Sequence, residues 1–238
     1  ENRGGARLFK SATPKDALHV GAQTRPIVHS VGVGDCYDAV YISLLDRFDP
    51  NEALGYASWI SSEYASYKNW ESFISKVNKI IETDPSDIIG LQGLRLKWED
   101  RDKINIYIAA PDFDYVDRTQ IDNVANCLKY HNFSPRLPIR EFGQADINDS
   151  IEKKEKLFQQ DIRLLDECDI LLAVLVEQDD GTMLEIGLAS GLNKPVVIYD
   201  PNRIASNLFL QNLPEFISSD LDEVLVRVFE IGSRIIND

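Results

Sequence analysis

The sequence has little that would support a disulfide framework, a membrane span or a metal site. Its three cysteines, Cys36, Cys127 and Cys168, are widely spaced and form no CxxC pair. Such an odd, scattered set predicts free thiols in a reducing compartment. No apolar run approaches the roughly 18–20 residues that cross a bilayer, and no secretory signal follows Glu1. We therefore expect a cytoplasmic protein with no membrane partner and no bound metal.

Basic residues are also scarce. The sequence has 25 Lys and Arg against 39 Asp and Glu, so the formal net charge is -14. Such a surface repels the phosphates of DNA and RNA, and a nucleic-acid polymer is not an expected partner. A small nucleoside or nucleotide remains compatible, because a local site can oppose the overall field. The 44% of hydrophobic residues is ordinary for 238 residues folded into one or two domains.

The chain divides near Asp84-Pro85 and the polar run 97–102. Residues 1–84 are predicted to form a partial α/β segment, because short apolar strands precede stretches of helical periodicity. The expected strands, joined by a turn, are 6–9 and 17–20; the expected helices are 39–45, 51–67 and one around 73–81.

Residues 103–238 alternate regularly between buried strands and amphipathic helices. This alternation predicts an α/β domain with a doubly wound parallel sheet, covered by helices on both faces. Ligands of such sheets bind at the carboxyl ends of the strands, so the site is expected near 107–114 and 176–181. The expected strands are 104–110, 169–176 and 194–199; the expected helices include 121–128, 151–165, 181–192 and 221–228.

Acidic side chains and a tyrosine gather at these predicted strand ends. Tyr107 lies in the first strand, Asp161 on the long helix, Asp179 after the second strand and Glu185 in the next helix. That helix starts with a Gly-Thr pair, whose free N–H groups are expected to favour an ionised Glu185. An ionised carboxylate can attack a sugar carbon while a second carboxyl group protonates the leaving group. Acidic residues are also common as plain helix caps and turn charges, and that interpretation stays open.

The stretches 160–174, 179–189 and 193–196, preceded by 106–111, resemble the nucleoside 2-deoxyribosyltransferase family. The resemblance covers roughly residues 103–236, and its most specific part is the run D-x-G-T-x-x-E-x-G. It implies a flavodoxin-like fold and cleavage of the N-glycosidic bond of a deoxynucleoside, with no cofactor.

On that family pattern, Glu185 matches the nucleophile that takes the deoxyribosyl group, and Tyr107 matches the residue that orients it. Asp161 and Asp179 match the acidic pair that contacts the departing base and helps to protonate it. Asn207 matches a position that reaches a neighbouring subunit's sugar site, which implies a homo-oligomer. The substrate-binding residues that the resemblance implies are Ala110, Asp112, Gly181 and Asn207, although Asp112 is equally typical of a turn.

Other activities fit the same residues. A sister branch hydrolyses deoxynucleoside 5′-monophosphates with the same Asp and Glu framework, so transfer and hydrolysis both remain open. A nucleotide-sensing module, which binds its ligand but turns it over slowly, is a third hypothesis.

Residues 30–39 resemble the C-terminal signature of ribokinase-like (PfkB) sugar and nucleoside kinases. The resemblance covers about residues 1–80. It implies that Gly32 and Gly34 form an anion hole for the transferred phosphate and that Asp35 is the base. Only the end of such a kinase is represented, so we expect a fragment of a longer kinase–glycosyltransferase fusion or a kinase remnant. ATP and Mg are implied only for a complete kinase domain in a longer parent protein.

Overall fold

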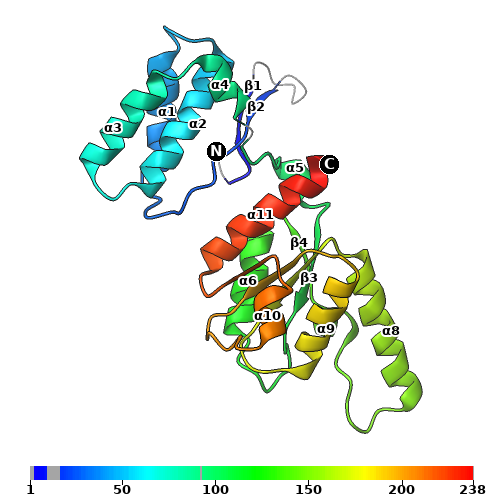
Figure 1. Ribbon diagram of the computed structural model, residues 1–238. Coiled ribbons are helices and arrows are strands. Elements are labelled where there is room, and N and C mark those ends of the chain that lie inside the picture. Colours follow the sequence, from blue (N-terminus) through cyan, green and yellow to red (C-terminus); the bar gives the residue numbers. More distant parts are fainter. Residues whose placement is uncertain (1–2, 10–16, 92, 238) are drawn as a thin grey trace. The chain divides into compact units, whose positions relative to one another are not determined.

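The computed structural model describes residues 3–9, 17–91 and 93–237. The chain forms two compact units, unit 1 over Glu1–Lys97 and unit 2 over Trp98–Ile236, as Figure 1 shows. Within the described ranges, no helix is long and apolar enough to cross a membrane. The same residues contain no group of three or more His, Cys, Asp or Glu side chains that could hold a metal ion.

Unit 1 packs helices against a two-stranded antiparallel sheet, in which Ala6 pairs with Val20 and Phe9 with Ala17. Both strands coincide with the predicted ones, whereas the predicted turn between them falls on 10–16, outside the described residues. The elements are β1 (Ala6–Phe9), β2 (Ala17–Val20), α1 (Val33–Leu44), α2 (Pro50–Ser66), α3 (Trp70–Ile81) and α4 (Pro85–Gly90).

The longest helix of unit 1, α2, has a well-defined start. Asp49 Oδ1 accepts hydrogen bonds from the backbone N–H groups of Asn51 and Glu52, and Glu52 Oε2 accepts one from the N–H of Asp49. Pro50 occupies the first helical position, where no N–H is needed. The buried face of α2 then packs into the core of unit 1 through Ala53, Tyr56 and Ile60.

Unit 2 is built on a five-stranded parallel sheet with the strand order β4-β3-β5-β6-β7. Numbered along the chain, this order is 2-1-3-4-5, the order of a flavodoxin-like fold. The strands are β3 (Asn105–Ala109), β4 (Ser134–Arg136), β5 (Ile170–Val174), β6 (Val196–Tyr199) and β7 (Phe216–Ser218). The helices are α5 (Trp98–Arg101), α6 (Thr119–Tyr130), α7 (Pro138–Phe142), α8 (Ile151–Glu167), α9 (Asp180–Gly191), α10 (Leu208–Asn212) and α11 (Leu221–Asn237).

Helices cover both faces of this sheet, with α8 and α9 on one face and α6 and α11 on the other (Figure 1). Alternate strand residues such as Tyr107 and Ala173 form one core with Leu164 of α8 and Ile186 of α9. The chain leaves β3 toward β4 on one side and leaves β5 toward β6 on the other. The loops after β3 and β5 therefore diverge, and this is where ligands bind in sheets of this order.

Candidate functional site

A hydrogen bond between β3 and α9 forms the centre of the candidate site. The hydroxyl of Tyr107 donates to Glu185 Oε1 at 2.6 Å. Tyr107 lies on the face of β3 that α8 and α9 cover, and its side chain is buried. Burial raises the pKa of Tyr107 far above its ordinary value, and the negative charge of Glu185 raises it further. The hydroxyl therefore stays protonated and remains a donor.

Glu185 is only partly exposed, and its carboxyl titrates near neutral pH. Desolvation by burial raises the pKa of Glu185 to about 7, the hydrogen bond from Tyr107 opposes this, and repulsion from Asp161 and Asp179 adds to it. The helix start was expected to favour an ionised Glu185, but the net shift of its pKa is upward. Because α9 begins at Asp180, Glu185 lies beyond the first turn, where the helix dipole is weak and burial outweighs it.

The two aspartates differ in their surroundings. Asp161 is half-buried on α8, and this burial raises its pKa, so its carboxyl retains a proton more readily than an ordinary aspartate. Asp179 caps α9, because its Oδ2 accepts bonds from the backbone N–H of Thr182 at 2.7 Å and from the Thr182 hydroxyl at 2.8 Å. A side chain at Gly181 would crowd this carboxylate, since its Cβ would lie 3.1 Å from Asp179 Oδ2.

We expect Asp179→Ala to lower the free energy of unfolding of unit 2 by about 1 kcal/mol, because the first turn of α9 loses its cap. Asp179→Ser is the matched control, since a serine hydroxyl can still accept from the backbone N–H of Thr182. The comparison is made by denaturant unfolding. Equal stability of the two variants would show that the cap contributes nothing.

The loop after β3 is anchored by an arginine that sequence reasoning missed. Both oxygens of the buried Asp112 are paired with Arg140, Oδ2 with Nε at 2.5 Å and Oδ1 with Nη2 at 2.8 Å. The backbone N–H of Asp112 also donates to the carbonyl of Ala110 at 2.8 Å. The Asp112 carboxylate is therefore already engaged. Arg140 lies in a short helix without readable periodicity, so no sequence pattern pointed to it.

The same loop presents two stacked aromatic rings. Phe113 and Tyr115 have ring centroids 5.3 Å apart with an interplanar angle of 10°. Tyr115 is 77% exposed, so its ring is accessible to solvent. An i, i+2 pair of this kind is also ordinary strand spacing, so the sequence gives no specific signal for the stack.

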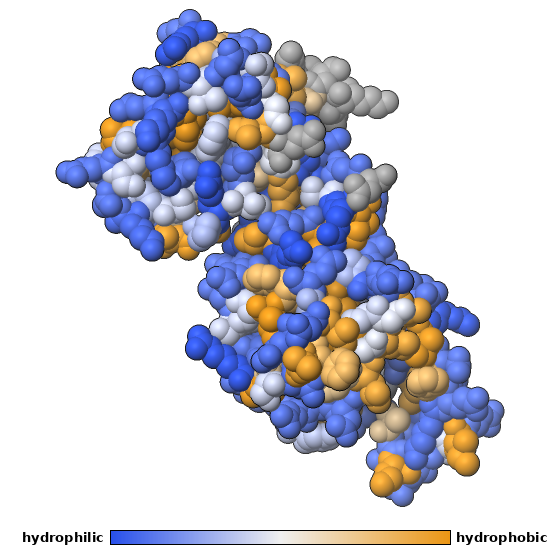
Figure 2. All heavy atoms as spheres, in the orientation of Figure 1, coloured by the Kyte–Doolittle hydropathy of each residue, from blue (hydrophilic) through white to orange (hydrophobic). Residues whose placement is uncertain are grey.

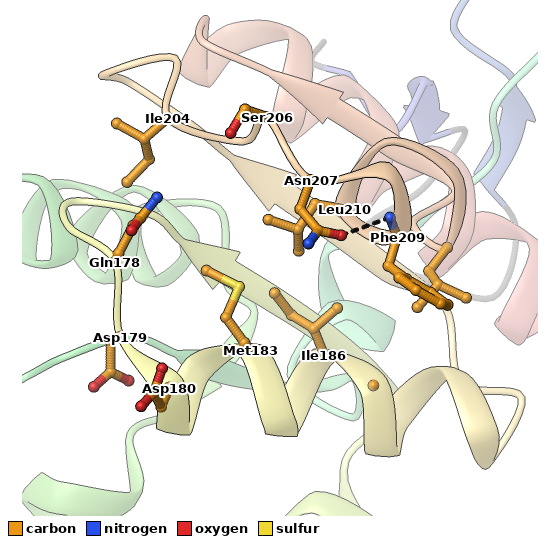
Figure 3. A pocket seen from close by; sticks show the side chains of 12 residues that line it. Gln178, Asp179, Asp180, Met183, Ile186, Ile204, Ser206, Asn207, Phe209 and Leu210 are labelled. Atoms are coloured by element: carbon orange, nitrogen blue, oxygen red, sulfur yellow. Dashed lines mark hydrogen bonds between the residues drawn. The ribbon is translucent and has the colours of Figure 1, made fainter.

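A cavity of about 510 Å³ lies between α9 and α10 (Figure 3). Asn207 lines it and caps α10, since its Oδ1 accepts from the backbone N–H of Phe209 at 2.8 Å. Most of the other lining is apolar, and the lining residues are Gln178, Asp179, Asp180, Met183, Ile186, Gly187, Ile204, Ser206, Asn207, Phe209, Leu210 and Leu213.

This cavity is not centred on Glu185. At 3.6 residues per turn, Met183 and Gly187 lie on the opposite side of α9 from Glu185, and of the four residues in the carboxylate site only Asp179 lines the cavity. Within one chain, the structure therefore brings Tyr107, Glu185 and the two aspartates together but places Asn207 on another side of α9.

The kinase-like residues lie in unit 1. Gly32 has a φ of 80°, a left-handed conformation that favours glycine, directly before α1. Gly34 and Asp35 are exposed in the first turn of that helix. Their roles as an anion hole and a base stay predictions.

A protein-family model matches the part of the chain that contains the site. The protein-family model described as nucleoside 2-deoxyribosyltransferase matches residues 106–216, a range that contains Tyr107, Asp161, Asp179 and Glu185. The uncharacterized protein UU063 of Ureaplasma parvum is 31% identical over 102 residues, which are 40% of this chain and 64% of that protein. The chain thus spans less than two thirds of this curated relative.

Solved structures with similarity to the chain include a 2-deoxyribosyltransferase of Bacillus psychrosaccharolyticus, which is 24% identical with a TM-score of 0.44. The match covers 50% of this chain and 89% of the chain in that structure. A CMP N-glycosidase of Clostridium botulinum, BcmB, is 19% identical with a TM-score of 0.36. The match covers 52% of this chain and 96% of the BcmB chain. The family match covers less than half of the chain, lies within unit 2, and begins after the segment with the kinase resemblance.

Proposed function

We propose that unit 2 cleaves the N-glycosidic bond of 2′-deoxynucleosides and transfers the sugar to a second base through a deoxyribosyl ester on Glu185. The observation that carries this proposal is the 2.6 Å hydrogen bond from Tyr107 to Glu185 Oε1, inside the range that the family model matches. A tyrosine that remains protonated holds one carboxylate oxygen and leaves the other free to attack.

The reaction then proceeds by two displacements. Glu185 Oε2 bonds to the anomeric carbon, the bond from that carbon to the base nitrogen breaks, and its electron pair leaves with the base. The departing base takes a proton from Asp161, whose raised pKa favours the protonated form. A second base attacks the same carbon through a ring nitrogen and gives up a proton to the Asp161 carboxylate. Glu185 is released as a carboxylate.

A neutral nucleoside fits this site better than a 5′-monophosphate. Glu185 is already under repulsion from Asp161 and Asp179, and a phosphate would add further negative charge. Arg140, which contacts the loop after β3, is paired with Asp112 and also lies 2.7 Å from Asp122. Its positive charge is therefore already compensated. Hydrolysis of deoxynucleoside monophosphates by the same site is the second hypothesis.

The assembly proposed for this function is a homo-oligomer. Figure 2 shows apolar side chains gathered on the face of unit 2 that carries α9 and α10. Their exposed members include Leu184, Leu188, Leu208 and Phe209. A second copy that covers this surface would bury it, and Asn207 would then lie at the boundary between subunits.

Incubation of the protein with deoxyadenosine and a second free base tests the proposed function. We expect a new deoxynucleoside, and an intact-mass shift by one deoxyribosyl group when no second base is supplied. Free deoxyribose in both reactions would instead support hydrolysis, and turnover of deoxyadenosine monophosphate alone would support the nucleotide hydrolase. Binding without any product would support a sensing module, and ATP-dependent phosphorylation of a sugar would support the kinase interpretation of unit 1.

A further inference from the structure

We propose that Arg140 is a positioning residue that sets substrate affinity by holding the loop between β3 and α6 in one conformation. The proposal rests on the proposed function for its substrate, a 2′-deoxynucleoside. Its structural half, the fixation of residues 110–118, does not depend on turnover.

The loop leaves the carboxyl end of β3, the strand that carries Tyr107. Its backbone turns back on itself twice, because the N–H of Asp112 donates to the carbonyl of Ala110 and the N–H of Val116 donates to that of Phe113. Asp114 and Tyr115 at its tip are exposed. A loop of this kind depends on side-chain contacts to keep one conformation.

Arg140 supplies such contacts by joining its own helix, α7, to two other elements. Standing on α7, it pairs in a bidentate manner with Asp112 of the loop, and its Nη2 lies 2.7 Å from Asp122 Oδ1 on α6. The planar guanidinium matches carboxylate geometry, which a lysine does not. The Asp112 side chain is 5% exposed, so without Arg140 its buried charge would be uncompensated and the loop would have to move to expose it.

The position of the loop matters for binding more than for chemistry. The loop carries the stacked rings of Phe113 and Tyr115, and an open aromatic face can stack on a nucleobase. The pair of Tyr107 and Glu185 is fixed separately, by β3 and α9. Displacement of the loop should therefore weaken the binding of substrate while the rate of the bound complex is little changed.

The neighbouring ion pair provides a matched control. Arg136 of β4 binds Glu141 of α7 in the same bidentate manner, with Nε to Oε1 at 2.8 Å and Nη2 to Oε2 at 2.6 Å. Both arginines are partly exposed, at 30% and 37% of the side chain. The Arg136 pair joins β4 to α7 and does not include a residue of the 110–118 loop.

The experiment compares Arg140→Gln with Arg136→Gln in the full chain. For Arg140→Gln we expect KM for a deoxynucleoside to rise about tenfold with kcat within about twofold, and amide exchange in 110–118 to accelerate about tenfold. Arg136→Gln should leave KM, kcat and the amide exchange of 110–118 within about twofold of their values in the unaltered protein. Arg140→Lys retains the charge without the fork and should fall between, and it serves as the test variant if Arg140→Gln does not fold.

Unchanged exchange in 110–118 would overturn the proposal, as would faster exchange with an unchanged KM or a loss confined to kcat. If the unaltered protein binds a deoxynucleoside without turnover, the proposed function fails. In that case, weaker binding of the same nucleoside to Arg140→Gln, measured by titration, still supports the role of Arg140. Absence of both binding and turnover in the unaltered protein overturns both proposals.

Discussion

Glu185→Gln is expected to reduce glycosidic cleavage by on the order of 10⁴-fold, because an amide cannot form the deoxyribosyl ester. The substitution preserves the size of the side chain and an oxygen that can accept from Tyr107 at the position where the structure has a 2.6 Å bond. The loss should therefore appear in kcat, measured by chromatography of the released base. Glu177→Gln, the same change in the exposed loop before α9, is the control and should retain full activity.

Glu185→Gln should also be more stable than the unaltered protein at high pH. A pKa of about 7 in the fold against an ordinary 4.5 means that ionisation of Glu185 costs the fold about 3 kcal/mol above pH 7. The cost is absent below pH 4.5, where the carboxyl is neutral in both states, and grows between those values. Hydrogen exchange of the slowest β3 and β5 amides at pH 4 and pH 8 measures it for unit 2. A constant difference between the two proteins across this range would contradict the raised pKa.

Much of the sheet was predictable because its central strands are continuous apolar runs. β3, β5 and β6 lie between helices whose periodicity is clear, and their predicted ranges agree with the structure. The outer strands β4 and β7 were not predicted, since each has three residues and β4 is Ser-Pro-Arg. A three-residue strand shows no alternation, and its position is fixed by pairing with the neighbouring strand.

The candidate site was predictable to the extent that topology determines it. Parallel strands place their carboxyl ends at one edge, and this brings Tyr107 toward the start of α9. The raised pKa of Glu185 was not predictable, because burial among packed helices is a tertiary property that helix-end reasoning omits. The same holds for Arg140, whose carboxylate partners come from α6 and from the loop after β3.

Tyr107→Phe is expected to lower kcat/KM by roughly 10–100-fold at neutral pH, the range for loss of one hydrogen bond to a charged group. Part of the loss comes from orientation, because the carboxylate is no longer held at one oxygen. The rest of the loss comes from a change in the pKa of Glu185. The bond from Tyr107 lowers the pKa of Glu185, so its removal raises that pKa above about 7 and leaves less of the ionised nucleophile at neutral pH.

The sign of this effect separates titration from a general loss of structure. Since the ionised carboxylate is the reactive form, the acidic limb of the kcat/KM profile should move to higher pH, and the loss should be larger at pH 6 than at pH 8.5. Tyr199→Phe is the matched control, because Tyr199 at the end of β6 donates to Gln120 Oε1 at 3.0 Å and does not contact Glu185. If Tyr107→Phe lowers kcat/KM equally at every pH, Tyr107 only orients Glu185. That result would contradict the prediction that Tyr107 also lowers the pKa of the nucleophile.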